Sequence, residues 1–357
     1  MAYGFLNGSN YNEDTMSIAQ LVERTLTEFH VPAGVVRLGT SAFAYCPLTQ
    51  IYLPEGIEEI GSSALAETTL TDITLPLSCG ILKGACLGNN KQLTKIIFGK
   101  VRTIQGNAFK GNSICMIFDF SRCDSVPNLQ STNSFDGTAS DSKILVPGWL
   151  YEAWINATNW SNFAERIVPV YDAPEVEVPD HVSEGLSYGY DDMYRKNGIW
   201  GRGSCTDTCV VIPAEIDGNV IGMVDGFRDD GLVEECWMWV PEITMGSDFL
   251  YGCPNLKKFY LDTSIEQSLS FADLKSLEYV KFGSHVSRIA AGVFQRCANV
   301  IFDFSDCTSI PALSSYGYGE EFGTNPTIMV PVELYGEWIS NDATGWVVYQ
   351  DHIVPVK

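Results

Sequence analysis

Few side chains in this chain have the types and spacing that catalysis or metal binding requires. No histidine stands at metal-ligand or triad-like spacing from a cysteine, an aspartate or a glutamate; the four are His30, His181, His285 and His352. No phosphate-binding glycine loop, nucleophile elbow or zinc-protease motif occurs in the chain. The sequence therefore predicts a protein that is not an enzyme and that uses no cofactor.

The eleven cysteines are too irregular for a disulfide framework, and most of them recur with an internal repeat. Cys46, Cys253 and Cys297 each follow a pair of apolar residues that contains phenylalanine. This recurrence is typical of a small buried hydrophobe in a stacked structure. Only Cys205 and Cys209 lie close together, and no second pair or histidine accompanies them. We therefore expect structural thiols and no metal site.

Two acidic segments have some resemblance to calcium ligands. Asp225–Gly231 (DGFRDDG) lacks the alternating ligands and the distal glutamate of a calcium loop, and Asp191-Asp192 is a bare acidic pair. Both are better interpreted as ordinary acidic turns.

Aromatic and lysine side chains recur on three expected strands of the second half. If Val240, Leu261 and Phe282 point inward, the residues before them point outward. Two outward columns then form, one of Trp239, Tyr260 and Lys281 and one of Trp237, Lys258 and Tyr279. Such columns suit a protein partner or a sugar ring. The alternative is that this face packs against the first half, the chain's own loops or another copy of the chain.

A second candidate binding segment precedes the last part of each half. It reads STNSFDGTASDS in the first half and SSYGYGEEFGTNP in the second. Tyr316, Tyr318 and Phe322 stand among glycines there, a composition typical of antibody-like binding loops. A divergent surface loop without a ligand is the alternative.

The elements that must position these residues come from a repeat of 22 residues. Leu48, Ile51, Leu53 and Pro54 recur as Leu70, Ile73, Leu75 and Pro76. A period of this length indicates a solenoid, in which each coil buries its apolar edge against the next. Ile51 and Leu53 are expected to point inward, and Gln50 and Tyr52 outward.

The first and last parts of each half differ from the repeat. Apolar residues at three- and four-residue steps predict a helix over Asp14–Phe29, so residues 1–30 either cap the first solenoid or serve as an assembly handle. Residues 147–170 predict two short helices and a strand, which we interpret as a C-terminal helical lid. Residues 173–184, rich in proline and acid, predict a semi-rigid linker.

The second half duplicates the first. Ile301 begins IFDFSDCTSIP and Ile117 begins IFDFSRCDSVP, and Trp154 recurs as Trp338 at the same offset. We therefore expect a mainly β fold with short helices, made of two tandem solenoids that each carry a C-terminal lid. The first covers residues 31–172 and the second residues 185–357.

The repeat resembles the BspA-type leucine-rich repeat. The resemblance is carried by Leu48, Ile51, Leu53, Pro54, Ile57, Ile60, Gly61 and Ala64. The segments Gly203–Pro213 and Trp154–Ile167 also look like those that flank such repeats in bacterial surface and prophage proteins. The resemblance implies binding or structural work, as a cell-surface adhesin or as part of a phage particle. It is specific for the fold and says little about the ligand.

Charge excludes several kinds of partner. The chain of 357 residues has 22 Lys+Arg and 44 Asp+Glu, a net charge of −22, which disfavours nucleic acids and anionic membranes. No run of 18 apolar residues is present, and the first residues lack the features of a signal peptide. We therefore expect a protein made in the bacterial cytoplasm and found in a virion.

These observations favour a non-enzymatic virion component, of tail, fibre or head-decoration type, that provides assembly contacts, host attachment or both. The first alternative is a secreted bacterial adhesin on the cell surface that binds host protein. The second is a carbohydrate-binding or carbohydrate-active protein. Expected partners are other proteins, a glycan or further copies of the chain, without membrane insertion.

Overall fold

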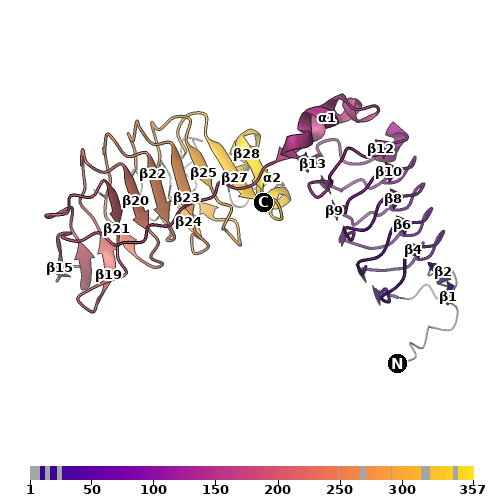
Figure 1. Ribbon diagram of the computed structural model, residues 1–357, viewed down its shortest axis with the longest axis horizontal. Helices are drawn as coiled ribbons and strands as arrows, with labels where there is room; N and C mark the ends of the chain where they lie inside the picture. Colours follow the sequence, from indigo (N-terminus) through magenta and orange to yellow (C-terminus); the bar gives the residue numbers. More distant parts are fainter. Residues whose placement is uncertain are drawn as a thin grey trace. The chain divides into compact units, whose positions relative to one another are not determined.

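The computed structural model describes residues 9–12, 17–21, 26–247, 249–265, 271–290, 292–314, 322–340 and 345–357, with side chains from residue 26 onward. Contacts divide the chain into two units, Met1–Tyr171 (unit 1) and Asp172–Lys357 (unit 2). Each unit is a stack of coils whose short strands run parallel (Figure 1). The prediction of a mainly β solenoid is confirmed.

Two columns of strands make up unit 1, because each coil contributes one strand to each column. The first column forms one sheet of β7, β9, β11, β13 and β14 and a smaller one of β3 and β5. Its strands are β3 (Glu28–His30), β5 (Gln50–Tyr52), β7 (Asp72–Thr74), β9 (Lys95–Ile97), β11 (Ile117–Asp119), β13 (Lys143–Pro147) and β14 (Ile167–Val170). The second column is β1 (Ser9–Asn12), β2 (Ser17–Leu21), β4 (Arg37–Leu38), β6 (Glu59–Ile60), β8 (Ile81–Leu82), β10 (Thr103–Ile104) and β12 (Asn128–Leu129).

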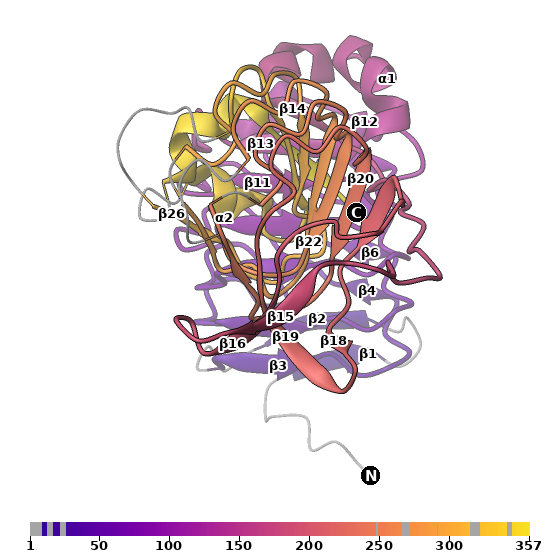
Figure 2. The ribbon, with the colours of Figure 1, turned by 90° about the vertical axis from the view of Figure 1, so that its left-hand side faces the viewer.

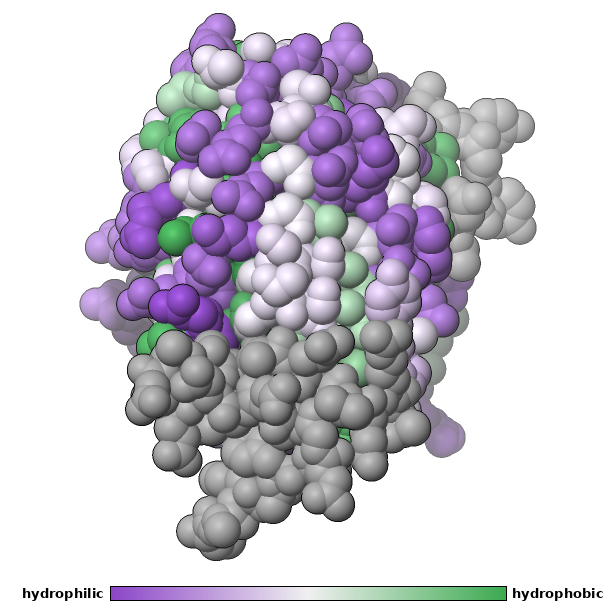
Figure 3. Space-filling model, turned by 90° about the vertical axis from the view of Figure 1, so that its right-hand side faces the viewer, coloured by the Kyte–Doolittle hydropathy of each residue, from purple (hydrophilic) through white to green (hydrophobic). Residues whose placement is uncertain are grey.

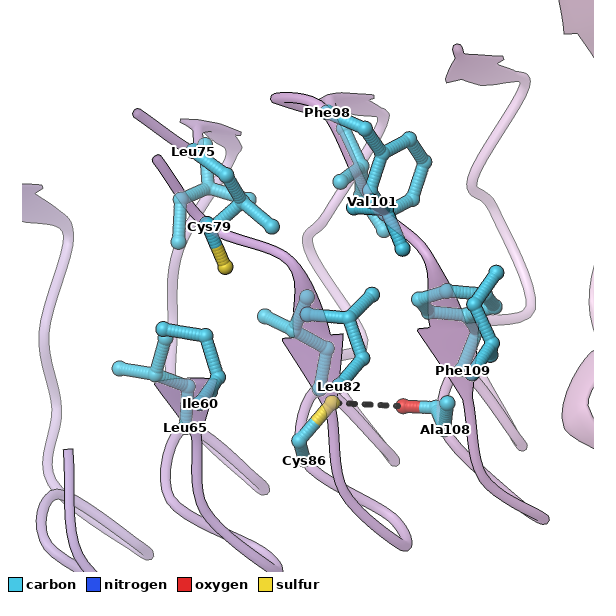
Figure 4. Close-up of a cluster of buried hydrophobic side chains, with 14 of the residues drawn as sticks. Ile60, Leu65, Leu75, Cys79, Leu82, Cys86, Phe98, Val101, Ala108 and Phe109 are labelled. Atoms are coloured by element: carbon cyan, nitrogen blue, oxygen red, sulfur yellow. Dashed lines mark hydrogen bonds between the residues drawn. The ribbon is translucent and has the colours of Figure 1, made fainter. Parts of the chain in front are cut away.

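The core of unit 1 lies between the two columns, where the repeated aliphatic residues of successive coils meet. Ile73 and Leu75 are buried, while Ile51 and Leu53, one coil earlier, are partly buried and pack against the same core. Figure 4 shows the coils stacking Ile60 and Leu65 beside Leu82 and Cys86, and these beside Ala108 and Phe109. The apolar edge of each coil is therefore covered by the next, as the 22-residue period predicts.

A ladder of buried polar side chains runs through the same stack. The side-chain nitrogen of Asn90 donates to the carbonyl oxygens of Leu65 and Leu87, at 2.9 Å each. Its side-chain oxygen accepts from the backbone N–H of Thr68 at 2.7 Å. Asn112 repeats the arrangement one coil later, and its side-chain oxygen accepts from the backbone N–H of Asn90 at 2.8 Å. These side chains satisfy backbone groups that the turns between strands leave unpaired.

The predicted helix over Asp14–Phe29 is wrong, because β2 and β3 occupy its described residues. The strand β3 pairs in parallel with β5, with Phe29 opposite Ile51. Leu26 and Phe29 stand 22 residues before Leu48 and Ile51, so this segment is one more coil of the repeat. Stacking partly buries its apolar residues against the core, which an isolated amphipathic helix at the chain end could not do without a partner. The role of residues 1–30 as a handle for another protein stays a prediction.

A helical lid closes the C-terminal end of each stack. In unit 1 the turn η1 (Thr132–Phe135) and β13 precede η2 (Gly148–Leu150), α1 (Tyr151–Asn156) and η3 (Trp160–Arg166). Trp154 and Trp160 are fully buried with ring centroids 4.4 Å apart, and the Trp160 indole donates to the Pro127 carbonyl at 2.8 Å. In unit 2 Trp338 and Trp346 repeat the pair at 4.4 Å.

Unit 2 is built around a seven-stranded parallel sheet in the order β17-β20-β22-β23-β25-β27-β28. Its strands are β17 (Cys209–Val211), β20 (Glu235–Met238), β22 (Lys258–Leu261), β23 (Tyr279–Phe282), β25 (Ile301–Asp303), β27 (Thr327–Pro331) and β28 (Ile353–Val356). The second column retains β24 (Arg288–Ile289) and β26 (Ala312–Leu313). Its lid consists of α2 (Tyr335–Ser340) and η5 (Trp346–His352).

The N-terminal end of unit 2 departs from the repeat. Here β15 and β16 form an antiparallel hairpin that joins β19, and β19 also pairs with β18 and β21 (Figure 2). These strands are β15 (Tyr188–Asp191), β16 (Lys196–Ile199), β18 (Glu215–Ile216), β19 (Asn219–Val224) and β21 (Thr244–Met245). Because β19 pairs in parallel with β21, these strands extend the second column at the N-terminal end of unit 2.

The surface is predominantly polar on the face drawn in Figure 3, where hydrophobic residues occur in small separate groups. Within the described ranges, no helix has the length and apolar character needed to cross a membrane.

Candidate functional site

The outward residues of β20, β22, β23 and β25 form two rows across the unit 2 sheet. Strand pairing places Trp237 beside Tyr260, Tyr260 beside Lys281, and Lys281 beside Asp303. The second row is Glu235, Lys258, Tyr279 and Ile301. Most of the predicted binding residues therefore do share one face.

The predicted columns were misaligned on β20. Leu261 pairs with Met238 and not with Val240, so Trp237 and not Trp239 is the neighbour of Tyr260. The prediction assumed coils of equal length, but the coil from β20 to β22 is two residues longer than the next. Trp239 instead lies one residue beyond the C-terminal end of β20.

The first row is covered rather than exposed. The exposed fraction is 3% for Trp237, 4% for Tyr260 and 7% for Lys281, whereas Trp239 retains 41%. The rings of Trp237 and Tyr260 stack with centroids 3.7 Å apart and planes 11° from parallel. Trp239 is therefore the one aromatic of the first predicted column that a partner can reach directly.

A buried polar cluster continues the row. The Lys281 ammonium contacts Asp303 at 3.3 Å, Asp306 at 3.2 Å and the Ser305 hydroxyl at 2.8 Å. The hydroxyl of Tyr279 donates to Asp303, and burial together with this hydrogen bond raises the pKa of Tyr279. Asp303 is fully buried, so these donors compensate a charge that would otherwise be costly.

What covers the row is the segment that was expected to be a linker. Residues 173–183, here called the strap, belong to unit 2 and lie across its sheet (Figure 1). The Ala173 amide donates to the Lys357 carbonyl at 3.0 Å, just after β28, and the Ser183 amide donates to Val211 of β17 at 3.1 Å. The strap is therefore anchored at both edges of the seven-stranded sheet.

The length of the strap explains its conformation. Six spacings between seven strands, at about 4.8 Å each, require roughly 29 Å. The ten residue steps from Ala173 to Ser183 reach at most about 35 Å. The strap must consequently run almost fully extended, and Pro174 and Pro179 favour that conformation. Between the anchors, no hydrogen bond joins the backbone of residues 174–182 to another described residue.

A groove of about 360 Å³ lies between the strap and the sheet. We call it the strapped groove; its lining consists of Ala173, Pro174, Val176, Val178, Trp237, Trp239, Tyr260, Lys281, Ser305 and Asp306. An adjoining hollow shares Val176 and Tyr260 and is also lined by Glu175, Glu177, Glu235 and Lys258. The unit 1 sheet has Thr74, Ile97 and Asp119 in its corresponding outward row. Its aromatic stack lies further toward the N-terminus, where the rings of His30 and Tyr52 have centroids 4.1 Å apart.

The other predicted binding loop does not join this site. Phe322 is fully buried and stacks on Trp346 of the lid, with centroids 5.1 Å apart, so its predicted role in contacting a partner is wrong. An aromatic residue close to the lid is recruited by the core because burying it stabilises the fold. Tyr316 and Tyr318 lie outside the described residues.

The structure brings together a histidine and an aspartate, His285 and Asp262, whose contact the sequence could not indicate. The His285 ring contacts the Asp262 carboxylate at 2.7 Å beside a hollow of about 390 Å³ that Ser264 and Ser287 also line. Neither serine hydroxyl is hydrogen-bonded to the imidazole in the described structure; Ser264 Oγ accepts from the amides of Ser287 and Arg288. The arrangement orders a turn and does not form a nucleophile–base pair.

The acidic turns and cysteines have local structural roles. Asp191 accepts from the amides of Met193 and Tyr194, and Asp230 pairs with Arg202 at 2.6 Å. All eleven cysteines are unbridged, and burial raises the pKa of thiols such as Cys79 to about 12. In the part of the chain that the structure describes, no group of three histidine, cysteine, aspartate or glutamate side chains could hold a metal.

Comparison with known proteins gives a match in both units. The family model for the BspA type leucine rich repeat region matches six copies, in residues 21–139 and 242–316, which together exceed half of the chain. No curated protein matches the sequence.

Among solved structures, a leucine-rich repeat protein from Bacteroides ovatus is 14% identical, with 96% of this chain and 86% of that chain covered and a TM-score of 0.23. A leucine rich cell surface protein from Faecalibacterium prausnitzii is also 14% identical, with 88% and 94% covered and a TM-score of 0.24. The pneumococcal vaccine antigen PcpA is 12% identical, with 93% and 79% covered and a TM-score of 0.25.

Proposed function

Because the chain belongs to the family of BspA-type leucine-rich repeat proteins, we propose that it is a non-enzymatic protein-binding protein whose main contact surface is the strapped groove of unit 2. Repeat solenoids of this kind offer extended surfaces for partners. Two locations fit this activity. In one, the protein sits on a bacterial cell surface as an adhesin; in the other, it is part of a phage particle and contributes assembly or host contacts.

The partial exposure of Trp239 supports this assignment most. A tryptophan that remains 41% exposed beside two buried aromatic rings gives a rigid apolar anchor at low entropic cost. Ser305 and Asp306, which line the same groove beyond β23, provide polar groups that fix the orientation of a partner. The outer face of unit 1 carries the stacked pair His30 and Tyr52 but no tryptophan in its described strands, so we expect the two units to have different contact roles.

Trp239→Ala is expected to weaken binding of the full chain to its protein partner at least tenfold, because interface tryptophans carry a large share of binding energy. Immobilised host surface proteins and disassembled phage structural proteins are the two target sets, measured by surface plasmon resonance. Retention by host proteins supports the adhesin, and retention by phage proteins supports the virion component.

Tyr52→Ala in unit 1 is the matched control, since Tyr52 is 45% exposed but lies outside the groove. It should leave binding unchanged, and both variants should keep the wild-type melting temperature. The proposal is rejected if Trp239→Ala binds as wild type does, or if the chain binds glycans and none of the proteins.

A further inference from the structure

The strapped groove has an excess of negative charge at its rim. Four carboxylates and two ammonium groups line the groove and the adjoining hollow: Glu175, Glu177, Glu235 and Asp306 against Lys258 and Lys281. Lys281 is already neutralised, because it contacts Asp303 and Asp306. The groups left to act on a ligand are therefore mostly anionic, as is the chain as a whole at −22.

The groove is elongated along the strap. Trp239 follows β20 and Asp306 follows β25, and the sheet order places β22 and β23 between those strands. Three strand spacings of about 4.8 Å separate the two ends by roughly 14 Å. About four residue steps of an extended peptide cover this length. A single compact ligand would leave one of the two ends without a contact.

Each end of the groove offers a contact for a cation. The Trp239 ring is accessible, and its centroid lies 6.5 Å from that of Trp237, with the planes tilted by 52°. An ammonium or guanidinium group placed over the exposed ring gains a cation–π interaction. At the other end, the Asp306 side chain remains 47% exposed although one of its oxygens contacts Lys281. Its carboxylate can accept charge-assisted hydrogen bonds.

We propose that the strapped groove binds an extended, basic peptide segment of a partner protein, with a lysine or arginine side chain over Trp239 and another against Asp306. This proposal rests on the protein-binding function above and specifies the chemistry of the partner. The carboxylates along the strap repel acidic segments and anionic sugars. A neutral sugar would gain nothing from the four carboxylates, so charge complementarity favours the basic peptide.

The test uses three capped pentapeptides with lysine, glutamine or glutamate at the first and last positions and valine between them, so that the two test side chains stand four extended residue steps, about 14 Å, apart. Isothermal titration calorimetry with the full chain measures their affinities at about 20 and 300 mM NaCl. The lysine peptide should bind at least tenfold more tightly than the glutamine peptide and lose affinity at high salt. The glutamate peptide should not bind. Trp239→Ala and Asp306→Asn should each weaken the lysine peptide at least threefold.

Asp72→Asn is the control for charge alone, because Asp72 is an exposed carboxylate on the unit 1 sheet. If it weakens the lysine peptide as much as Asp306→Asn does, the attraction is non-specific and the proposal is wrong. Equal affinity for the lysine and glutamine peptides, or tighter binding of a neutral oligosaccharide, also overturns it. If partner proteins still require Trp239 in those cases, the protein-binding function survives without the basic specificity.

Discussion

Replacing Trp160 with alanine is expected to lower the free energy of unfolding of unit 1 by about 4 kcal/mol. The side chain is fully buried in the lid, where it contacts Trp154 and Phe120, with centroids 4.4 Å and 5.5 Å away. Its removal leaves a large cavity at the last coil and deprives the Pro127 carbonyl of its donor, at 2.8 Å. Large-to-small substitutions of buried tryptophan cost about 3–5 kcal/mol.

Urea unfolding followed by far-UV circular dichroism measures this loss, and the lid supplies its own controls. Trp149 lies in the same lid but is 73% exposed, so Trp149→Ala should change the free energy of unfolding by less than about 0.5 kcal/mol. The Trp154 indole N–H has no acceptor among the described residues, so Trp154→Phe should cost less than Trp160→Phe. Equal effects of Trp149→Ala and Trp160→Ala would contradict the claim that burial of Trp160 in the lid stabilises unit 1.

Asn90→Ala is expected to cost about 3–4 kcal/mol, because the substitution breaks the polar ladder inside the stack. The Leu65 carbonyl and the Thr68 amide and hydroxyl would lose their partners where water cannot replace them. A buried polar group left without a partner costs about 1–3 kcal/mol. Thermal and urea unfolding of the full chain measure the effect.

Asn128→Ala is the matched control, since Asn128 lies on the exposed side of β12, and it should change stability only slightly. Asn112→Ala should not add to Asn90→Ala independently, because the side-chain amides of both residues donate to the Leu87 carbonyl oxygen, at 2.9 Å each. Contacting residues in one network couple by about 0.5–3 kcal/mol. Additivity of the two substitutions would show that the ladder does not act as a unit.

The repeat was predictable because the apolar residues that the coils bury recur at a fixed step in the sequence. Ile73 and Leu75 recur at a fixed step, and this step sets which residues meet when coils stack. The duplication of the lids was also visible, since Trp154 and Trp338 stand in matching sequences. The family model and the strand pairing confirm the solenoid and the BspA-type repeat.

The errors arose where two structures satisfy the same local pattern. Leu26 and Phe29 have a spacing that suits a helix, yet they also continue the 22-residue step, and pairing of β3 with β5 decides between the two. The register of Trp237 depends on the length of one coil, which no local pattern fixes.

The position of the strap could not be predicted from the sequence. Its proline- and acid-rich sequence predicts a semi-rigid linker. The two anchors, at Lys357 and Val211, lie far from the strap in sequence and become neighbours only when the sheet is complete. The sequence therefore indicates the stiffness of this segment but not where it lies.

Hydrogen–deuterium exchange of the strap, in the full chain with and without the lysine peptide, tests the central claim most directly. In the free protein, the amides of Ala173 and Ser183 should exchange slowly, while those of residues 175–178 exchange rapidly, because only the two ends are hydrogen-bonded to the sheet. Binding of the peptide should slow exchange at residues 175–178 and around Trp239. Rapid exchange at Ala173 and Ser183 as well, unchanged by the peptide, would mean that residues 173–183 form a free linker and that the groove does not exist.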